Sequence, residues 1–368
     1  MNTGRKIRVL IVDDSALVRR AISDALSQDP DIEVVGTAVD PYAARDKIRD
    51  LSPDVLTLDI EMPRMDGLTF LQLIQRHRPM PVIVISSTTR SGSESALKAL
   101  EYGAIDVLCK PSSAYSIGEL ARQLPSRVKI AARARMAPPA PDQSSATRPE
   151  YSTRRDVQYL PRQLVVIGAS TGGTEAIRQV LTGLPGPLPG ICIVQHIPAS
   201  FSQAFAERLN RLCDFEVREA ANHDEVRAGL ALVAPGDQHM TVDWTETGYR
   251  VHLNRGPMLH HTRPAVDVLF SSAAACSGAR VVAMLLTGMG SDGALGMKKL
   301  KDIGATTIVQ NEETCMVYGM PRAAVALGVV DRILPIEAIP GAVYQAAQEP
   351  LRNLSKSQLA RSESRPAK

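Results

Sequence analysis

Short runs of β-branched and apolar residues alternate with helical patterns along the chain, and this alternation constrains the fold more than any other feature. In the first 130 residues, strands are expected at 7–12, 33–38, 55–59, 82–86 and 105–109, each followed by a helical pattern. Strict alternation of this kind is typical of a doubly wound α/β fold, a parallel sheet with helices on both faces. Such folds bind ligands at the carboxyl ends of their strands.

A second series of the same kind begins at Leu164, with strands expected at 164–169, 191–195, 230–234, 281–286 and 306–310. Two segments at 240–244 and 251–253 are expected to form an antiparallel hairpin inserted into this sheet. Residues 136–161, between the two series, are rich in proline, small residues and arginine, which bury too little apolar surface to fold. We therefore expect a first domain at 1–130, a linker at 131–162, a second domain at 163–350 and a disordered tail at 351–368.

The charge distribution excludes one class of partner. Residues 164–350 carry 14 basic and 18 acidic side chains, and the excess of positive charge lies in the linker and the tail. A DNA-binding output domain needs a basic face, so we expect no nucleic acid as partner. No apolar run reaches the roughly 20 residues that cross a bilayer, and the polar start lacks a secretory signal. We expect a cytoplasmic protein without membrane insertion.

Charged and hydroxyl side chains stand at the strand ends of the first domain. Asp13 and Asp14 follow the first strand and Asp59 ends the third, so three carboxylates converge on one edge of the sheet. Carboxylates this close raise one another's pKa unless a cation holds them, and open oxygen sites suit Mg²⁺. Ser86 and Lys110 point at the same edge, and the whole set is able to receive a phosphoryl group. The plainer alternative is that Asp13 and Asp14 cap a helix and Lys110 is a solvated charge.

This first domain resembles a response-regulator receiver domain, which has a flavodoxin-like fold. The resemblance is carried by Val-Asp-Asp-Ser at 12–15, Leu-Asp-Ile-Glu-Met-Pro-Arg-Met-Asp-Gly at 58–67, Ile-Ser-Ser at 85–87 and Cys-Lys-Pro at 109–111. It implies that Asp59 accepts a phosphoryl group from a histidine kinase, with Ser86 as the switch hydroxyl and Lys110 as the phosphate-binding lysine. The Mg²⁺ ligands that it implies are Asp13, Asp14, Asp59 and the backbone carbonyl of Glu61.

The turn Gly168-Ala169-Ser170-Thr171-Gly172-Gly173 follows the first strand of the second domain. A serine between a buried strand and a helix is lifted above the sheet, where hydrolases place a nucleophile. His196 follows the strand 191–195 and is placed to take the proton of Ser170. Asp292, beyond the strand 281–286, is placed to orient the imidazole and to stabilise its charged form. Thr171 and Met289 are the candidate residues for binding or supporting an oxyanion.

Each part of this constellation has a plainer alternative. Asp292 can cap the helix that follows it, and the glycine-rich turn at 170–173 can form an anion nest or hold a cofactor phosphate. A dinucleotide site needs G-x-G-x-x-G, however, and Ser170 occupies the second glycine position, where it would obstruct a pyrophosphate. The order Ser, His, Asp also differs from the Ser, Asp or Glu, His order of α/β-hydrolases.

Placed behind a receiver domain, this Rossmann-like second domain resembles the chemotaxis protein-glutamate methylesterases. Besides the triad, the resemblance is carried by residues 195–198, 201–209, 234–239, 263–267, 287–296, 310–312 and 318–322. It implies a serine hydrolase that removes methyl esters from glutamates of methyl-accepting chemoreceptors, releases methanol, and often deamidates receptor glutamines. No cofactor is expected in this catalytic domain.

A receiver joined through a linker to a catalytic domain suggests how the activity is controlled. We expect the unphosphorylated receiver to cover Ser170 and phosphorylation of Asp59 to favour an open arrangement. Two rival functions stay open on the sequence alone. One is a binding output with a decayed triad, and the other is a nucleotide-dependent enzyme that uses the glycine-rich turns.

Overall fold

The computed structural model describes residues 5–87, 89–110, 114–134, 162–184, 188–276, 278 and 280–348. The chain divides into two compact units, residues 1–146 and 147–368. Each unit has a parallel sheet of its own. Apart from its two ends, the expected linker at 131–162 lies outside the described residues, and so does the expected tail at 351–368.

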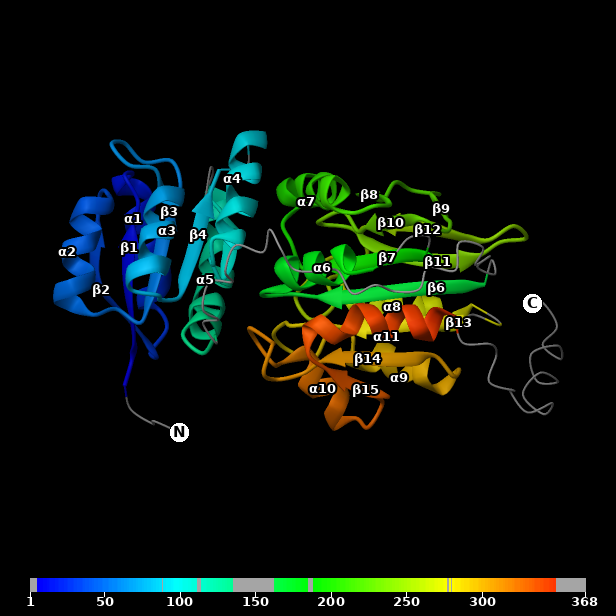
Figure 1. The fold of residues 1–368 in the computed structure, drawn as a ribbon. Helices are drawn as coiled ribbons and strands as arrows, with labels where there is room; N and C mark the ends of the chain where they lie inside the picture. Colours follow the sequence, from blue (N-terminus) through cyan, green and yellow to red (C-terminus); the bar gives the residue numbers. More distant parts are fainter. Residues whose placement is uncertain are drawn as a thin grey trace. The chain divides into compact units, whose positions relative to one another are not determined.

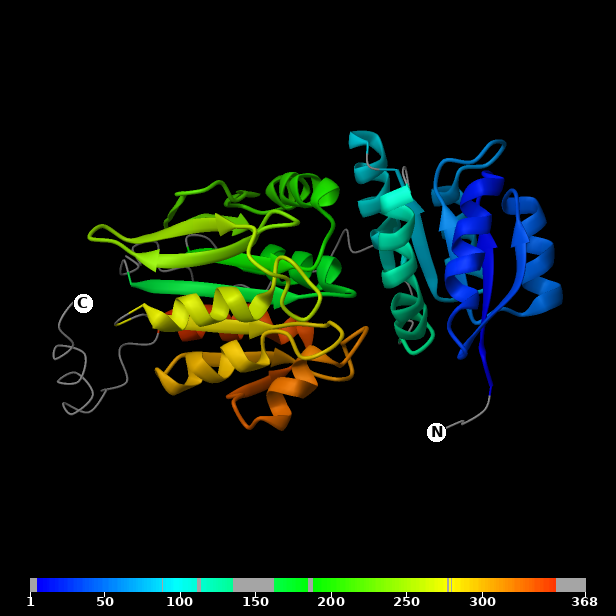
Figure 2. The same ribbon diagram turned by 180° about the vertical axis from the view of Figure 1, so that it is seen from behind.

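The first unit is built on a five-stranded sheet in the order β2-β1-β3-β4-β5, in which every pair of neighbours is parallel. Its strands are β1 (Ile7–Val12), β2 (Ile32–Ala38), β3 (Val55–Asp59), β4 (Val82–Ser86) and β5 (Asp106–Cys109). Its helices are α1 (Ala16–Ser27), α2 (Pro41–Leu51), α3 (Gly67–His77), α4 (Arg90–Glu101) and α5 (Ala114–Ala131). Figures 1 and 2, seen from opposite sides, show α2 and α3 over one face and α1 and α5 over the other. The predicted doubly wound fold is confirmed.

Short polar side chains cap the N-termini of the helices that follow β1, β2 and β3. The side chains of Ser15, Asp40 and Asp66 accept hydrogen bonds from the free N–H groups at the starts of α1, α2 and α3. Strands β3 and β4 are buried along their whole length, as expected when helices cover both faces. The chain order reverses between β1 and β3, so the carboxyl ends of these strands flank the crevice where such sheets bind ligands.

The second unit is built on a seven-stranded parallel sheet in the order β15-β14-β13-β6-β7-β10-β8. Its strands are β6 (Gln163–Ala169), β7 (Gly190–Gln195), β8 (Glu216–Glu219), β10 (Leu230–Val233), β13 (Arg280–Leu285), β14 (Thr306–Gln310) and β15 (Arg332–Leu334). Its helices are α6 (Gly173–Thr182), α7 (Ala199–Leu212), α8 (Val266–Ala275), α9 (Ala294–Asp302), α10 (Met320–Ala326), the 3₁₀ turn η1 (Ile336–Ala338) and α11 (Ile339–Gln348). Figures 1 and 2 show α6 and α11 over one face and α8 and α9 over the other. The second predicted parallel sheet is confirmed as well.

The predicted hairpin forms, but it does not join the parallel sheet. Strands β11 (His239–Trp244) and β12 (Tyr249–Asn254) pair antiparallel, and β12 also pairs with the two-residue strand β9 (Glu225–Val226). These three strands make a separate sheet, and β11 packs against α8. Alternating buried residues on β11 and β12, such as Met240, Val242 and Val251, enter the core of the second unit from this sheet.

Two glycines let the chain turn sharply at the carboxyl edge of the second sheet. Gly172 and Gly293 precede α6 and α9 with φ angles of 76° and 88°, a left-handed conformation that L side chains rarely adopt. A Cβ atom at Gly172 would also lie 2.7 Å from the Cβ of Met316. These turns carry Ser170 and Asp292, and they lie beyond β6 and β13, the two strands between which the chain order of this sheet reverses.

Candidate active site and acidic site

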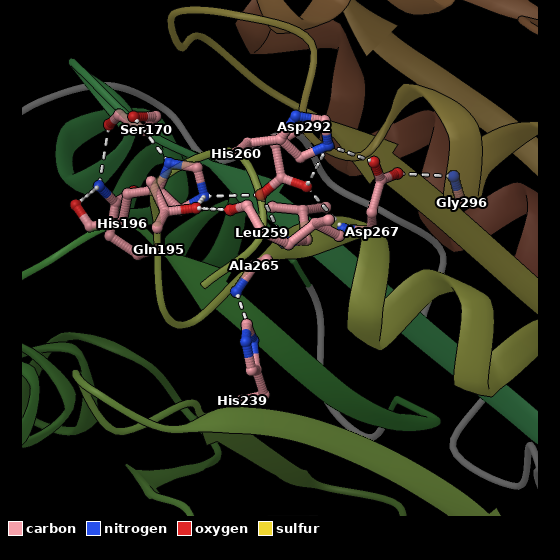
Figure 3. Close-up of polar contacts among 12 residues, drawn as sticks. Ser170, Gln195, His196, His239, Leu259, His260, Ala265, Asp267, Asp292 and Gly296 are labelled. Carbon is pink, nitrogen blue, oxygen red and sulfur yellow. Dashed lines mark hydrogen bonds and ion pairs between the residues drawn. The ribbon is translucent and has the colours of Figure 1, made fainter. Parts of the chain in front are cut away.

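Ser170 and His196 stand side by side because their strands are neighbours. Ala169, the last residue of β6, pairs with Gln195, the last residue of β7. One residue further on, the N–H of His196 donates to the Ala169 carbonyl, and the His196 Nδ1 lies 3.1 Å from the Ser170 Oγ. The structure therefore brings together the predicted nucleophile and the predicted base (Figure 3).

Asp292 lies on the other side of the imidazole. Its Oδ2 is 2.8 Å from the His196 Nε2 and also accepts the N–H of Val266, while its Oδ1 accepts the N–H of Asp267. Burial alone would raise the pKa of Asp292, but the hydrogen bonds from His196 and the two backbone groups outweigh it and hold this pKa below its usual value. An ionised carboxylate at this position favours the imidazole tautomer with its proton on Nε2, in which the Nδ1 that faces Ser170 is an acceptor.

The imidazole is turned the other way round from that of trypsin-like proteases. There, the Nε2 faces the serine and the Nδ1 faces the aspartate; in this chain Nδ1 faces Ser170 and Nε2 faces Asp292. The Thr262 Oγ1 lies 3.4 Å from the same Nε2. The chemical roles stay the same, because either ring nitrogen can act as the base when the other is held in its N–H form.

The backbone around Ser170 limits which groups can bind an oxyanion. The Ser170 N–H is used, because it donates to the Thr287 carbonyl at 3.0 Å. Within the described residues, the N–H groups of Thr171 and Met289 have no hydrogen-bond partner. A Cβ added to Gly288, just before Met289, would lie 2.7 Å from the Ser170 Cβ, so this loop passes close to the serine. The two predicted oxyanion residues thus retain free donors near the site.

Gln195 was missed as a site residue. Its buried amide donates from Nε2 to the carbonyl of Ser170 at 2.8 Å and to that of His196 at 3.1 Å, which ties the two strand ends together (Figure 3). Its place directly before His196, at the end of a strand whose other residues are apolar, was the available signal. The buried Gln195 Oε1 and the Thr171 Oγ1 have no partner among the described residues.

Two further histidines lie near the triad, although their sequence context did not predict it. His260 donates from Nε2 to Asp267 at 2.9 Å, and this Nε2 is 3.9 Å from the Asp292 Oδ1. The buried His239 accepts the Ala265 N–H at Nδ1 and donates from Nε2 to the Pro257 carbonyl. Both rings brace the segment 257–267, which passes beside Asp292 (Figure 3).

The predicted acidic residues of the first unit also meet. One carboxylate oxygen each from Asp13, Asp14 and Asp59 lies within 4.8 Å of the others. The Lys110 Nζ is 2.6 Å from the Asp59 Oδ2 and 3.4 Å from the Asp13 Oδ2. Burial, helped by the negative charge of Asp13, raises the pKa of Asp59 to about 6, against the lowering effect of Lys110.

This arrangement fits a hard divalent cation. The buried Asp13 Oδ2 accepts no hydrogen bond in the described part of the chain, and two of the three carboxylates are almost completely removed from water, Asp13 and Asp59 being each 1% exposed. Oxygen atoms left in this state are suitable ligands for Mg²⁺. The N–H of Glu61 donates to the Asp59 Oδ1 at 3.1 Å, which brings its backbone beside the same carboxylate.

The predicted switch hydroxyl is hydrogen-bonded to the start of α4. The Ser86 Oγ donates to the carbonyl of Gly92, in the first turn of α4, at 3.0 Å. The next residue, Ser87, donates to the Glu61 carboxylate at 3.1 Å. In this arrangement the two hydroxyls contact α4 and the loop after β3, rather than a group on Asp59.

Family models match both units of the chain. The model described as response regulator receiver domain matches residues 9–122, and the model described as CheB methylesterase matches residues 165–343. In the described residues, no helix is long and apolar enough to cross a membrane.

Three curated relatives match nearly the whole chain, and all three carry the name protein-glutamate methylesterase/protein-glutamine glutaminase. The relative from Syntrophus aciditrophicus, which is numbered 2 in that organism, is 50% identical, and the match covers 91% of this chain and 97% of the relative. The relative from Anaeromyxobacter dehalogenans, numbered 4 in that organism, is 49% identical, and the match covers 94% of this chain and 96% of the relative. The relative from Bdellovibrio bacteriovorus is 46% identical, with 94% and 98% covered.

Proposed function

The chain belongs to the CheB methylesterase family, with a response-regulator receiver domain ahead of the catalytic one, and from this premise we propose that it demethylates chemoreceptors under the control of phosphorylation. Its substrates are glutamate methyl esters on methyl-accepting chemoreceptors in the cytoplasm. The observation that carries the proposal is the contact of Ser170 with His196 and of His196 with Asp292. A domain that only binds a partner has no need of such a hydrogen-bonded chain.

The proposed reaction proceeds through an acyl-enzyme. The Ser170 Oγ attacks the γ-acyl carbon of the ester while His196 takes the hydroxyl proton at Nδ1, and Asp292 stabilises the resulting imidazolium. The N–H groups of Thr171 and Met289 donate to the oxyanion of the tetrahedral intermediate. When this intermediate collapses, His196 returns the proton to the leaving oxygen, and methanol departs. A water molecule then attacks the acyl carbon while His196 takes its proton, and His196 returns this proton to the Ser170 Oγ as the receptor glutamate is released.

Receptor glutamines fit the same sequence of steps. The side-chain amide places the same γ-acyl carbon before Ser170, and the leaving group becomes ammonia, protonated by His196. No further side chain is required, so we extend the proposal to deamidation, in line with the second half of the relatives' names.

In the receiver domain we propose Asp59 as the acceptor of a phosphoryl group from a histidine kinase. Asp13, Asp14, Asp59 and the Glu61 backbone carbonyl would hold Mg²⁺, which supplies positive charge to the transferred group. Lys110, already paired with Asp59, remains to pair with a phosphoryl oxygen. Ser86 would exchange its bond to Gly92 for one to the phosphoryl group and so alter the start of α4.

We further propose that the unphosphorylated receiver restricts access to Ser170. The test is deletion of residues 1–150, which removes the first compact unit and leaves the second sheet intact. Basal ester hydrolysis should rise in the truncated enzyme. Unchanged or lower activity, with an intact melting transition, would count against inhibition by the receiver but leave the esterase proposal standing.

A serine-directed probe separates this proposal from a binding output. A fluorophosphonate should label the wild-type chain at Ser170, as located by peptide mapping, and should not label Ser170→Ala. Ser271 is a matched control: it lies on α8, and among the described residues its hydroxyl is hydrogen-bonded only to the Lys299 ammonium. Ser271→Ala should therefore be labelled normally. Absence of labelling in the folded wild-type chain would favour the binding output. Tight binding of a nucleotide, measured by calorimetry, would favour the other rival function, a nucleotide-dependent enzyme that uses the glycine-rich turns.

A further inference from the structure

At the N-termini of α8 and α9, a carboxylate from the start of each helix accepts backbone N–H groups of the other. Asp292 stands just before α9, yet its side chain accepts the first two N–H groups of α8, those of Val266 and Asp267. In return Asp267, in the first turn of α8, accepts the N–H of Gly296 in the first turn of α9 at 2.6 Å. Each helix thus offers unpaired N–H groups and a positive dipole end to a carboxylate of the other.

Asp267 has a second contact that reaches the active-site loop. Its Oδ2 accepts a hydrogen bond from the His260 Nε2 at 2.9 Å. His260 stands with a φ of 53° in a tight turn in which Leu259 and Thr262 exchange backbone hydrogen bonds. The hydroxyl of Thr262 is the group that lies 3.4 Å from the His196 Nε2. The Asp267 carboxylate therefore ties the turn at 259–262 to the same helix ends that hold Asp292 (Figure 3).

Because they are buried, the carboxylates of Asp267 and Asp292 are held in fixed positions by these contacts. Asp292 is 1% exposed and Asp267 is 4% exposed, so neither carboxylate can exchange its partners for water. A buried carboxylate keeps its position only while its hydrogen-bond donors keep theirs. The two backbone donors of Asp292 belong to the helix end that Asp267 ties to α9. A shift at Asp267 is therefore transmitted to the Asp292 oxygen that holds the His196 Nε2.

We propose that Asp267 and His260 are positioning residues of the esterase, which hold Asp292 and the turn at 259–262 in place around His196. This inference rests on the proposed function, since it names groups that align its triad. Neither residue touches the reacting atoms. Their effect should appear in the turnover step, because a displacement of about 1 Å in a catalytic group can slow a reaction about 100-fold.

A cation site is the competing interpretation of the same residues. One ligand atom each from His260, Asp267 and Asp292 lies within 4.8 Å of the others. The hydrogen bonds argue against it, because His260 already donates to Asp267 and the Asp292 oxygens already accept three N–H groups. A chelator should therefore leave the basal esterase activity of the full chain, measured without phosphodonor, unchanged. A loss restored by a divalent metal would overturn the positioning role in favour of a metal site.

The deciding experiment compares kcat and KM of full-length variants on membranes with methylated receptors. Asp267→Ala and His260→Ala should lower kcat by about 10- to 100-fold with KM unchanged. Asp267→Asn keeps an oxygen for Gly296, and His260→Gln keeps a donor for Asp267, so both should recover part of the loss. The acid limb of the kcat profile should move to lower pH in the alanine variants, because a displaced Asp292 stabilises protonated His196 less.

A matched histidine provides the control. His252 on β12 pairs with Asp243 at 3.2 Å. No hydrogen bond or ion pair joins it to the triad in the described part of the chain, so His252→Ala should retain the wild-type kcat. A wild-type kcat and pH profile in folded Asp267→Ala and His260→Ala would overturn the inference. If Asp267→Ala fails to fold, the same result in His260→Ala overturns it. A wild-type enzyme that hydrolyses no ester would instead refute the proposed function on which the inference rests.

Discussion

The Nδ1 of His196 lies 3.1 Å from the Oγ of Ser170, and both residues directly follow neighbouring parallel strands. The contact therefore depends on the pairing of β6 with β7, whose last residues stand opposite each other. The loop after β13, on the other side of β6, adds Asp292. Three adjacent strand ends around the point where the strand order reverses thus supply the whole proposed triad.

Replacing Asp292 by Asn should remove most of the activity. The amide cannot stabilise the imidazolium and favours the wrong tautomer of His196, an effect worth about 10⁴-fold in kcat for the equivalent change in trypsin. Steady-state methanol release with the purified variant measures it. A loss of less than about tenfold would mean that His196 works without Asp292, and that Asp292 serves chiefly to cap α8.

Gln195→Leu should slow the enzyme with little change in KM. The substitution keeps the volume of the side chain but removes the donor that holds the carbonyls of Ser170 and His196. We expect a loss in kcat of about 10- to 100-fold. Stability should fall by about 1 to 3 kcal/mol, because the His196 carbonyl loses its donor, while the Ser170 carbonyl keeps the Gly173 N–H at 2.7 Å. Gln203→Ala, an exposed change on α7, is the control. Wild-type turnover in a folded Gln195→Leu enzyme would contradict the alignment role.

Asp59→Asn should stabilise the receiver domain at neutral pH when Mg²⁺ is chelated. The carboxyl ionises at about 6 in the folded chain against 3.8 for its ordinary value. The unfolded chain therefore releases this proton first, and stability falls as the pH rises from about 4 to about 6. Above that range the ionised group opposes folding by about 1 to 3 kcal/mol.

Thermal unfolding of the full chain at pH 4.5 and 7.5 measures this effect. The gain from Asp59→Asn should be present at pH 7.5 and shrink at pH 4.5, while Asp14→Asn, at an exposed carboxylate, should change little. Mg²⁺ should raise the melting temperature of the wild type more than that of Asp59→Asn. An equal gain at both pH values would show that the charge of Asp59 is not its cause.

The parallel core of both units could be predicted from sequence because its strands are long apolar runs. Strands β8, β9 and β15 were not predicted, because they are short and carry charged residues such as Glu216, Arg218 and Arg332. The hairpin was predicted but assigned to the wrong sheet. Its pairing with β9 depends on the contact of Tyr249 with Val226, which local periodicity does not reveal.

The site could be predicted where its residues end strands and not where they lie in loops. Ser170, His196 and Asp292 follow β6, β7 and β13, so parallel topology alone brings them near one another. His260 lies in an irregular turn, and Asp267 looks like an ordinary first-turn acid of α8. Only the packing of α8 on α9 brings these two toward Asp292. The orientation of the His196 ring likewise depends on contacts that no sequence pattern records.

The most direct test of the account is methanol release from membranes that carry methylated chemoreceptors, measured with and without a small phosphodonor and Mg²⁺. The wild-type chain should release methanol, and the phosphodonor should accelerate it. Ser170→Ala should lose activity by at least about 1000-fold, and Asp59→Asn should keep basal release without the acceleration. Methanol release by a folded Ser170→Ala variant at the wild-type rate would contradict the account.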